Sequence, residues 1–260
     1  MKRVLVFQHI SIEHPGIFRE FMKADDVIWD AIELDEGEQI PSLEPYDALI
    51  VMGGPMDVFE EDKFPWLIDE KRAIREWVIE RRKPYLGLCL GHQLLADALG
   101  GKVGRMTTPE VGMLTVETTP EAKTDALLKG LGPTIDCLQW HGCEVTGLPK
   151  GSTVLARSPA CAVQAFRVGD RAYGLQYHVE LTDRTVAEWG AVPIYAESLE
   201  QCCGRGALGR LDADAKTRLP ALASNARQLY DNFKALVTAS KKSGKPSRWR
   251  TRVGPEPDPH

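Results

Sequence analysis

The 260-residue sequence has no apolar run that approaches the roughly 20 residues needed to cross a bilayer. The first ten residues start with basic side chains but reach Gln8 and His9 too soon for a secretory signal. Positive charge is not in excess either, since 32 Lys and Arg face 37 Asp and Glu, for a net charge of −5. We therefore expect neither a membrane nor a nucleic acid as a partner.

The six cysteines form no C-x-x-C pair and show no spacing typical of zinc ligation. Cys202 and Cys203 are adjacent, and adjacent cysteines bridge only with strain. We expect free thiols in a reducing cytoplasm, and neither a metal nor a cofactor. A hydrophobic content of 43% and a charged content of 27% are ordinary for a globular protein, so one large domain is expected.

Short apolar strands alternate with amphipathic helices over the first hundred residues. This alternation predicts a mostly parallel sheet with right-handed crossovers, covered by helices on both faces. The apolar spacing predicts strands at 4–7, 27–34, 46–52 and 85–88, and helices at 17–22, 65–82 and 90–99.

After residue 101 the pattern changes to short β-rich runs separated by Gly, Pro, Asp and Thr. We expect antiparallel hairpins, one of them turning at Gly169-Asp170, and one helical turn at 124–128. Helix returns from Thr182, and an amphipathic helix over 222–237 is expected to dock on the sheet. The fold class is thus an α/β three-layer sandwich with an added antiparallel part. The strands of that part are predicted at 111–116, 135–140, 153–157, 161–168 and 172–177.

Residues 1–240 are expected to form the folded domain, and residues 241–260 a tail. In the tail, six Lys and Arg side chains face only Glu256 and Asp258, and there is no apolar pattern. Such a segment is expected to be disordered, either as a solvated tail or as a basic arm for an acidic partner.

Cys89 lies between the strand at 85–88 and the helix at 90–99. Gly87 and Gly91 flank it symmetrically, as a sharp strand-to-helix turn requires. Such a turn would lift the thiol clear of the sheet and place it at a helix N-terminus, which lowers the pKa of a thiol. Cys89 is therefore a candidate nucleophile, with a buried packing cysteine as the alternative.

His178 and Glu180 are two residues apart at the end of an expected strand, so their side chains should lie on one face. The imidazole could take a proton from Cys89 while the carboxylate holds the ring in orientation. Gly53 and Gly54 follow the strand at 46–52, at the same sheet edge as Cys89. Their backbone N–H groups, together with that of Leu90, could bind an oxyanion, although an ordinary Gly-Gly-Pro turn explains the glycines equally well.

Three motifs in this order resemble the class-I, triad-type glutamine amidotransferases, in particular the glutaminase domain of GMP synthetase. They are G-G-P at 53–55, G-L-C-L-G-H-Q at 87–93 and G-L-Q-Y-H-V-E at 174–180, and the resemblance covers about residues 40–182. It implies a flavodoxin-like fold and hydrolysis of the side-chain amide of glutamine through a cysteine thioester. Ammonia would pass to a separate synthetase subunit or another acceptor.

By position in these motifs, the resemblance implies that Cys89 is the nucleophile, His178 the base and Glu180 the group that orients it. It likewise implies that Gly54 and Leu90 supply the oxyanion donors.

The resemblance also implies a set of substrate-binding residues, namely Gly53, Gln93, His141 and Gly142. From the sequence alone, His141 could equally be structural. Val179 stands where a proline is usual, and this change should have only a small effect. Cys143 stands where relatives usually carry aspartate, so recognition of the α-amino group could be weaker and the preferred substrate different.

Three further hypotheses remain open. The same triad could hydrolyse γ-glutamyl bonds in small conjugates or peptides. The chain could also be a binding or regulatory subunit with an idle triad. An α/β-hydrolase is a poorer match, because that fold orders its triad as nucleophile, acid and then histidine. The sequence has no P-loop, so any ammonia-accepting chemistry would lie elsewhere.

Overall fold

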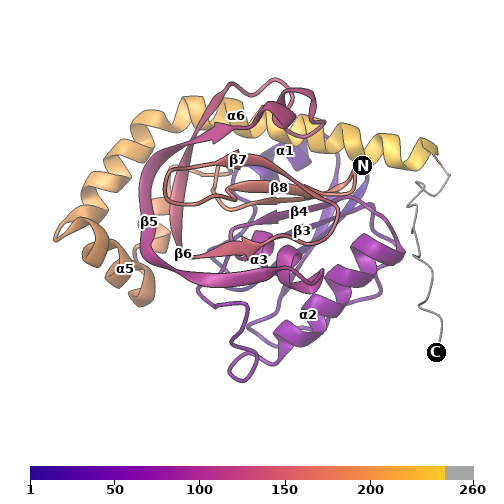
Figure 1. Cartoon of the computed structure of the whole chain (residues 1–260), viewed down its shortest axis with the longest axis horizontal. Helices are drawn as coiled ribbons and strands as arrows, with labels where there is room; N and C mark the ends of the chain where they lie inside the picture. Colours follow the sequence, from indigo (N-terminus) through magenta and orange to yellow (C-terminus); the bar gives the residue numbers. More distant parts are fainter. Residues whose placement is uncertain (244–260) are drawn as a thin grey trace, which may run out of the picture.

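A computed structural model describes residues 1–243 of the chain (Figure 1). Most of the predicted basic tail, from residue 244 on, lies outside the described residues. The strands are β1 (Arg3–Gln8), β2 (Ile28–Glu33), β3 (Ala48–Val51), β4 (Tyr85–Leu88), β5 (Lys102–Thr118), β6 (Thr134–Gly147), β7 (Ser152–Arg157), β8 (Ala165–Val168) and β9 (Ala172–Leu175).

All of these strands belong to one sheet, in the order β2-β1-β3-β4-β9-β8-β7-β5-β6. The five strands from β2 to β9 are parallel to one another, and the rest pair antiparallel. The parallel half has the strand order of flavodoxin-like folds. The predicted parallel sheet with an antiparallel extension is thus confirmed, as is the hairpin at Gly169 between β8 and β9.

Helices cover both faces of the parallel half. The helices are α1 (Phe18–Ala24), α2 (Trp66–Arg75), a π-helical turn η1 (Glu76–Glu80), α3 (Leu90–Ala98), a 3-10 turn η2 (Pro120–Thr124), α4 (Thr185–Trp189), α5 (Pro193–Cys203) and α6 (Ala207–Ser243).

Side chains of β3 alternate between the two layers of the core. Ala48 and Ile50 pack with α1 and α6, and Leu49 and Val51 pack with α2 and α3. Because both faces are covered, all four residues are buried, which explains the continuous apolar run in the sequence. Figure 1 shows α6 crossing one side of the sheet and α2 lying on the other.

A third apolar cluster joins β5 and β6 to helices α4 and α5. It contains Trp140, Trp189 and Tyr195, whose rings lie within about 6 Å of one another. This cluster places α5 beside the carboxyl edge of the sheet.

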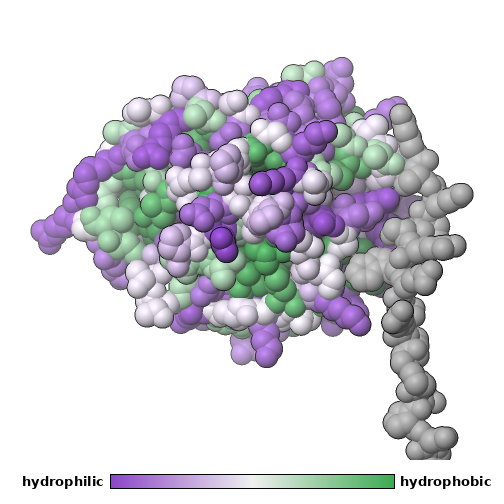
Figure 2. Space-filling model, turned by 45° about the horizontal axis from the view of Figure 1, so that its top comes forward, coloured by the Kyte–Doolittle hydropathy of each residue, from purple (hydrophilic) through white to green (hydrophobic). Residues whose placement is uncertain are grey.

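The face shown in Figure 2 is mostly hydrophilic, with hydrophobic side chains in small separate areas.

Three predictions about the antiparallel half and the C-terminus need correction. The strand expected at 161–168 starts only at Ala165, because Ser158 and Cys161 close a turn through two hydrogen bonds of 2.8 and 3.0 Å. The helical turn expected at 124–128 lies earlier, at η2. The last helix begins at Ala207 rather than at residue 222, and it reaches three residues into the predicted tail. None of the helices in residues 1–243 combines the length and apolar character of a membrane crossing.

Candidate active site

Cys89 occupies the strained turn that its flanking glycines predict. Its φ of 50° and ψ of −103° lie in a region that side chains rarely adopt. A Cβ atom on Gly91 would lie 2.2 Å from the carbonyl oxygen of Val51, and one on Gly87 would lie 2.3 Å from the carbonyl oxygen of Gly91. Only glycine therefore fits at both positions, and α3 packs directly against the sheet. The Cys89 N–H anchors the turn by donating to Leu175 at 2.8 Å.

His178 and Glu180 form the buried pair that their spacing predicts. Nδ1 of His178 lies 2.6 Å from Oε1 of Glu180, and the second carboxylate oxygen accepts from the Val179 N–H at 3.0 Å. Because an ionised carboxylate only accepts, Nδ1 carries the hydrogen and Nε2 is left for another partner. One detail differs from the prediction, since β9 ends at Leu175 and the pair lies beyond it. A short bridge between His178 and Leu138 holds the backbone instead.

The charges of Cys89 and His178 depend on each other. Burial works against the imidazolium, but Glu180 and Cys89 outweigh it and raise the pKa of His178 well above its usual value. Burial raises the pKa of Cys89, and His178 opposes that effect. The expectation of a lowered thiol pKa at the helix N-terminus is therefore wrong: the Leu90 amide does lower the pKa, but by less than burial raises it.

The Gly53-Gly54 loop is held by the side chains of His9 and Glu70, which were not predicted to belong to the site. Nδ1 of His9 lies 2.8 Å from the Gly53 carbonyl oxygen, and Nε2 lies 2.9 Å from the carboxylate of Glu70. Both side chains are fully buried. A Cβ on Gly54 would meet the side chains of His9 and Leu90 at 2.8 and 3.0 Å. The loop is thus fixed against the first turn of α3, near Cys89. His9 follows the first strand at the carboxyl edge, and that position is the signal that could have found it.

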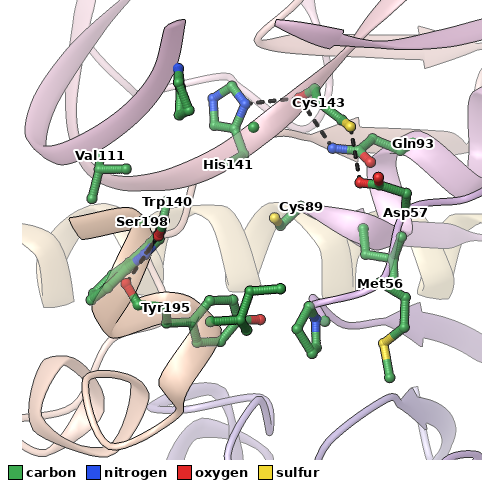
Figure 3. Close-up of a pocket in the computed structure, with 16 residues that line it drawn as sticks. Met56, Asp57, Cys89, Gln93, Val111, Trp140, His141, Cys143, Tyr195 and Ser198 are labelled. Carbon is green, nitrogen blue, oxygen red and sulfur yellow. Dashed lines mark hydrogen bonds between the residues drawn. The ribbon is translucent and has the colours of Figure 1, made fainter. Parts of the chain in front are cut away.

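A cavity of about 190 Å³ opens beside Cys89 (Figure 3). Its wall includes five more of the residues predicted for the site, namely Gly54, Leu90, Gln93, His141 and Gly142. Gly53, His178 and Glu180 are not part of this wall. Among the described residues, no three His, Cys, Asp or Glu side chains are grouped as a metal site.

The cavity has two chemically different sides. Figure 3 shows Asp57, Gln93 and Cys143 on one side of Cys89, and Trp140, Tyr195 and Ser198 on the other. Val111 also lies on the second side, and Ile194, the neighbour of Tyr195 on α5, lines the cavity as well.

Gln93 and Gln176 connect Cys89 to the polar side of the cavity. Nε2 of Gln93 donates to Oε1 of Gln176 at 3.1 Å and to the carbonyl oxygen of Cys143 at 3.2 Å. Gln176 in turn donates to the sulfur of Cys89 at 3.7 Å. Nδ1 of His141 lies 2.9 Å from the same Cys143 carbonyl, so this ring is held by protein groups. Gln176 precedes His178 by two residues, which places both side chains on one face of an extended backbone. This spacing could have identified Gln176 from the sequence.

Residues 16–188 match the family model described as glutamine amidotransferase class-I. The chain is 36% identical over 152 residues to a glutamine-hydrolyzing GMP synthase subunit from Sulfurisphaera tokodaii, covering 58% of this chain and 76% of that relative. It is 28% identical over 170 residues to gamma-glutamyl peptidase 3 of Arabidopsis thaliana, covering 62% and 66%. A crystal structure of a glutamine amidotransferase from Thermotoga maritima superposes with a TM-score of 0.80 at 29% identity, covering 89% of this chain and 97% of that one.

Proposed function

Because the chain belongs to the class-I glutamine amidotransferases, we propose that it hydrolyses the side-chain amide of glutamine with Cys89, His178 and Glu180 as catalytic triad. One observation carries the proposal: Cys89 lies in a strained turn on the wall of a cavity, and the buried His178–Glu180 pair interacts with its thiol. A nucleophile, a base and a group that orients the base are the parts that acyl transfer needs.

In the proposed reaction, the sulfur of Cys89 attacks the amide carbon and the thiol proton passes to Nε2 of His178. The N–H groups of Gly54 and Leu90 would bind the oxyanion, each such donor being worth on the order of 2.7–4 kcal/mol in the transition state. The imidazolium then protonates the leaving nitrogen, and ammonia departs from a thioester. Water attacks the thioester, His178 takes the proton of that water and returns it to the sulfur, and glutamate is released.

We further propose that the ammonia passes to a separate synthetase subunit. The support is the relative from Sulfurisphaera tokodaii, which is named as one subunit of a GMP synthase.

The aromatic side of the cavity favours a second candidate, the hydrolysis of γ-glutamyl amides of larger amines. Trp140, Tyr195 and Ile194 would have no role in holding ammonia, but they offer an apolar surface to a bulkier leaving group. The similarity to a gamma-glutamyl peptidase agrees with this candidate.

The deciding experiment measures glutamate release from glutamine and from a γ-glutamyl dipeptide. Cys89→Ala serves as the blank, and Cys202→Ala, at an exposed cysteine, is the matched control. Turnover of glutamine that needs Cys89 supports the first candidate, and turnover of the dipeptide alone supports the second. If neither substrate is turned over, labelling by a diazo-ketone analogue of glutamine separates the remaining cases. A labelled Cys89 indicates a missing partner, whereas an unlabelled one in folded protein contradicts the triad.

A further inference from the structure

Asp57 is the only carboxylate among the described side chains that line the cavity. It lies on the loop after β3, three residues beyond Gly54, and its side chain is 23% exposed. Glu60 fixes this loop by accepting from the Asp57 N–H at 3.0 Å. Asp57 thus brings negative charge to the polar side of the cavity.

Two neighbours from different strands hold the Asp57 carboxylate. Arg105 on β5 donates to Oδ2 through Nε at 3.0 Å and through a terminal nitrogen at 2.8 Å. Cys143 on β6 donates its thiol to Oδ1 at 3.0 Å. Arg105 and Cys143 are cross-strand partners, so their side chains meet Asp57 from one face of the β5–β6 ribbon. The Arg105 guanidinium also lies 5.6 Å from the centroid of the Phe59 ring, which further limits its freedom.

The two carboxylate oxygens have different partners. A carboxylate can accept about four hydrogen bonds, and a thiol is a weak donor. Oδ2 faces a guanidinium, but within residues 1–243 Oδ1 accepts only from the Cys143 thiol, so it can still accept a strong donor from the cavity. An ammonium group is such a donor, and its charge complements the carboxylate.

We propose that Asp57 binds the α-ammonium group of the glutamyl substrate and thereby selects amino-acid substrates, with Arg105 as a positioning residue. This inference rests on the proposed function. Figure 3 shows Cys89 between Asp57 on one side and Tyr195 with Trp140 on the other. A substrate with its α-carbon near Asp57 would present its γ-carbonyl to Cys89, and its leaving amine would point toward the aromatic side.

The test measures alkylation of Cys89 in the full chain by mass spectrometry. Two diazo ketones are compared, the analogue of L-glutamine and the same compound without the α-amino group, with iodoacetamide as the small reference reagent. The variant is Asp57→Asn, and the matched control is Asp69→Asn on α2, which removes the same charge from an exposed site.

We expect wild-type protein and Asp69→Asn to react about 10- to 100-fold faster with the amino compound than with the compound that lacks the amino group. The second compound cannot form one charge-assisted hydrogen bond, and this loss corresponds to a rate difference of that size. Asp57→Asn should lose this preference, and its reaction with iodoacetamide shows that Cys89 is still accessible. The inference is overturned if Asp57→Asn keeps the preference. It is also overturned if the wild-type protein, which needs no variant to fold, reacts equally with both compounds.

A different result would contradict the proposed function itself: neither diazo ketone modifies Cys89 of the wild-type protein, whereas iodoacetamide does.

Discussion

The hydroxyl of Tyr195 donates a hydrogen bond to Oε1 of Glu13, which lies 182 residues earlier in the sequence. The bond joins α5, which covers the aromatic side of the cavity, to the loop after β1. Both residues are buried, and burial raises the pKa of Glu13. The other Glu13 oxygen has no hydrogen-bond partner among the described residues and lies 1.8 Å from where a Cβ of Gly53 would be. Glu13 therefore depends on Tyr195 for its side-chain hydrogen bond.

Tyr195→Phe should lower the free energy of unfolding by about 1–3 kcal/mol, because it leaves a buried carboxyl group without a partner. Urea denaturation monitored by tryptophan fluorescence measures the change. Tyr177→Phe is the matched control, since the buried hydroxyl of Tyr177 has no hydrogen-bond partner in the described part of the chain. Its removal should not lower the free energy of unfolding, because it takes away a buried polar group that has no partner to lose. Equal effects of the two variants would contradict this role of Tyr195.

Glu180→Gln should lower the turnover of glutamine by about 10²–10⁴-fold. The amide cannot supply the negative charge that raises the pKa of His178, nor hold the ring as firmly. Steady-state glutamate release measures the effect, with the exposed neighbour Asp183→Asn as the control of equal charge change. A Glu180→Gln protein with near wild-type turnover would remove Glu180 from the proposed triad.

The parts of the fold and site that sequence predicts are those with a local pattern. The continuous apolar run of β3 and the glycines around Cys89 each lie within a few residues, and the structure has both where they are expected. His178 and Glu180 are two residues apart, so any extended backbone brings them together. Local sterics and spacing are sufficient in these cases.

Other features depend on contacts between distant segments and leave no local pattern. Strands β5 and β6 are 17 and 14 residues long, yet only about six residues of each are predicted. Their remaining residues alternate less clearly, because the ribbon extends beyond the core and shifts register between Arg105 and Glu110. Asp57 and Tyr195 likewise reach the cavity only through the tertiary fold.

His178→Gln should shift the pH midpoint of Cys89 alkylation upward. Burial raises the pKa of this thiol, and the hydrogen bond and charge of His178 are the largest opposing effects. Without the imidazole, the thiolate forms only at higher pH. The rate constant with iodoacetamide, measured by peptide mass spectrometry from pH 6 to 10, gives the midpoint, and the exposed Cys202 in the same digest is the internal reference. An unchanged or lower midpoint would show that His178 does not act on the thiol.

His92 should make the folded protein less stable as the pH falls into the acid range. It is fully buried on α3, and burial lowers its pKa from 6.5 to about 3, against smaller opposing effects of the Gly174 and Val163 backbone. Between these two values the unfolded state binds a proton that the folded state does not. Folded protein therefore loses stability as the pH falls through this range, by up to about 1.4 kcal/mol per pH unit.

His92→Leu should remove this dependence. From pH 7 to pH 5, wild-type protein should lose about 2 kcal/mol more unfolding free energy than the variant, as a single group with these two pKa values requires. The difference between the two proteins is the relevant quantity, because groups such as His9, whose pKa is raised, contribute with the opposite sign in both. Urea denaturation at pH 7, 6 and 5 measures it. Parallel pH curves for the two proteins would mean that His92 takes up its proton in the folded state as readily as in the unfolded state.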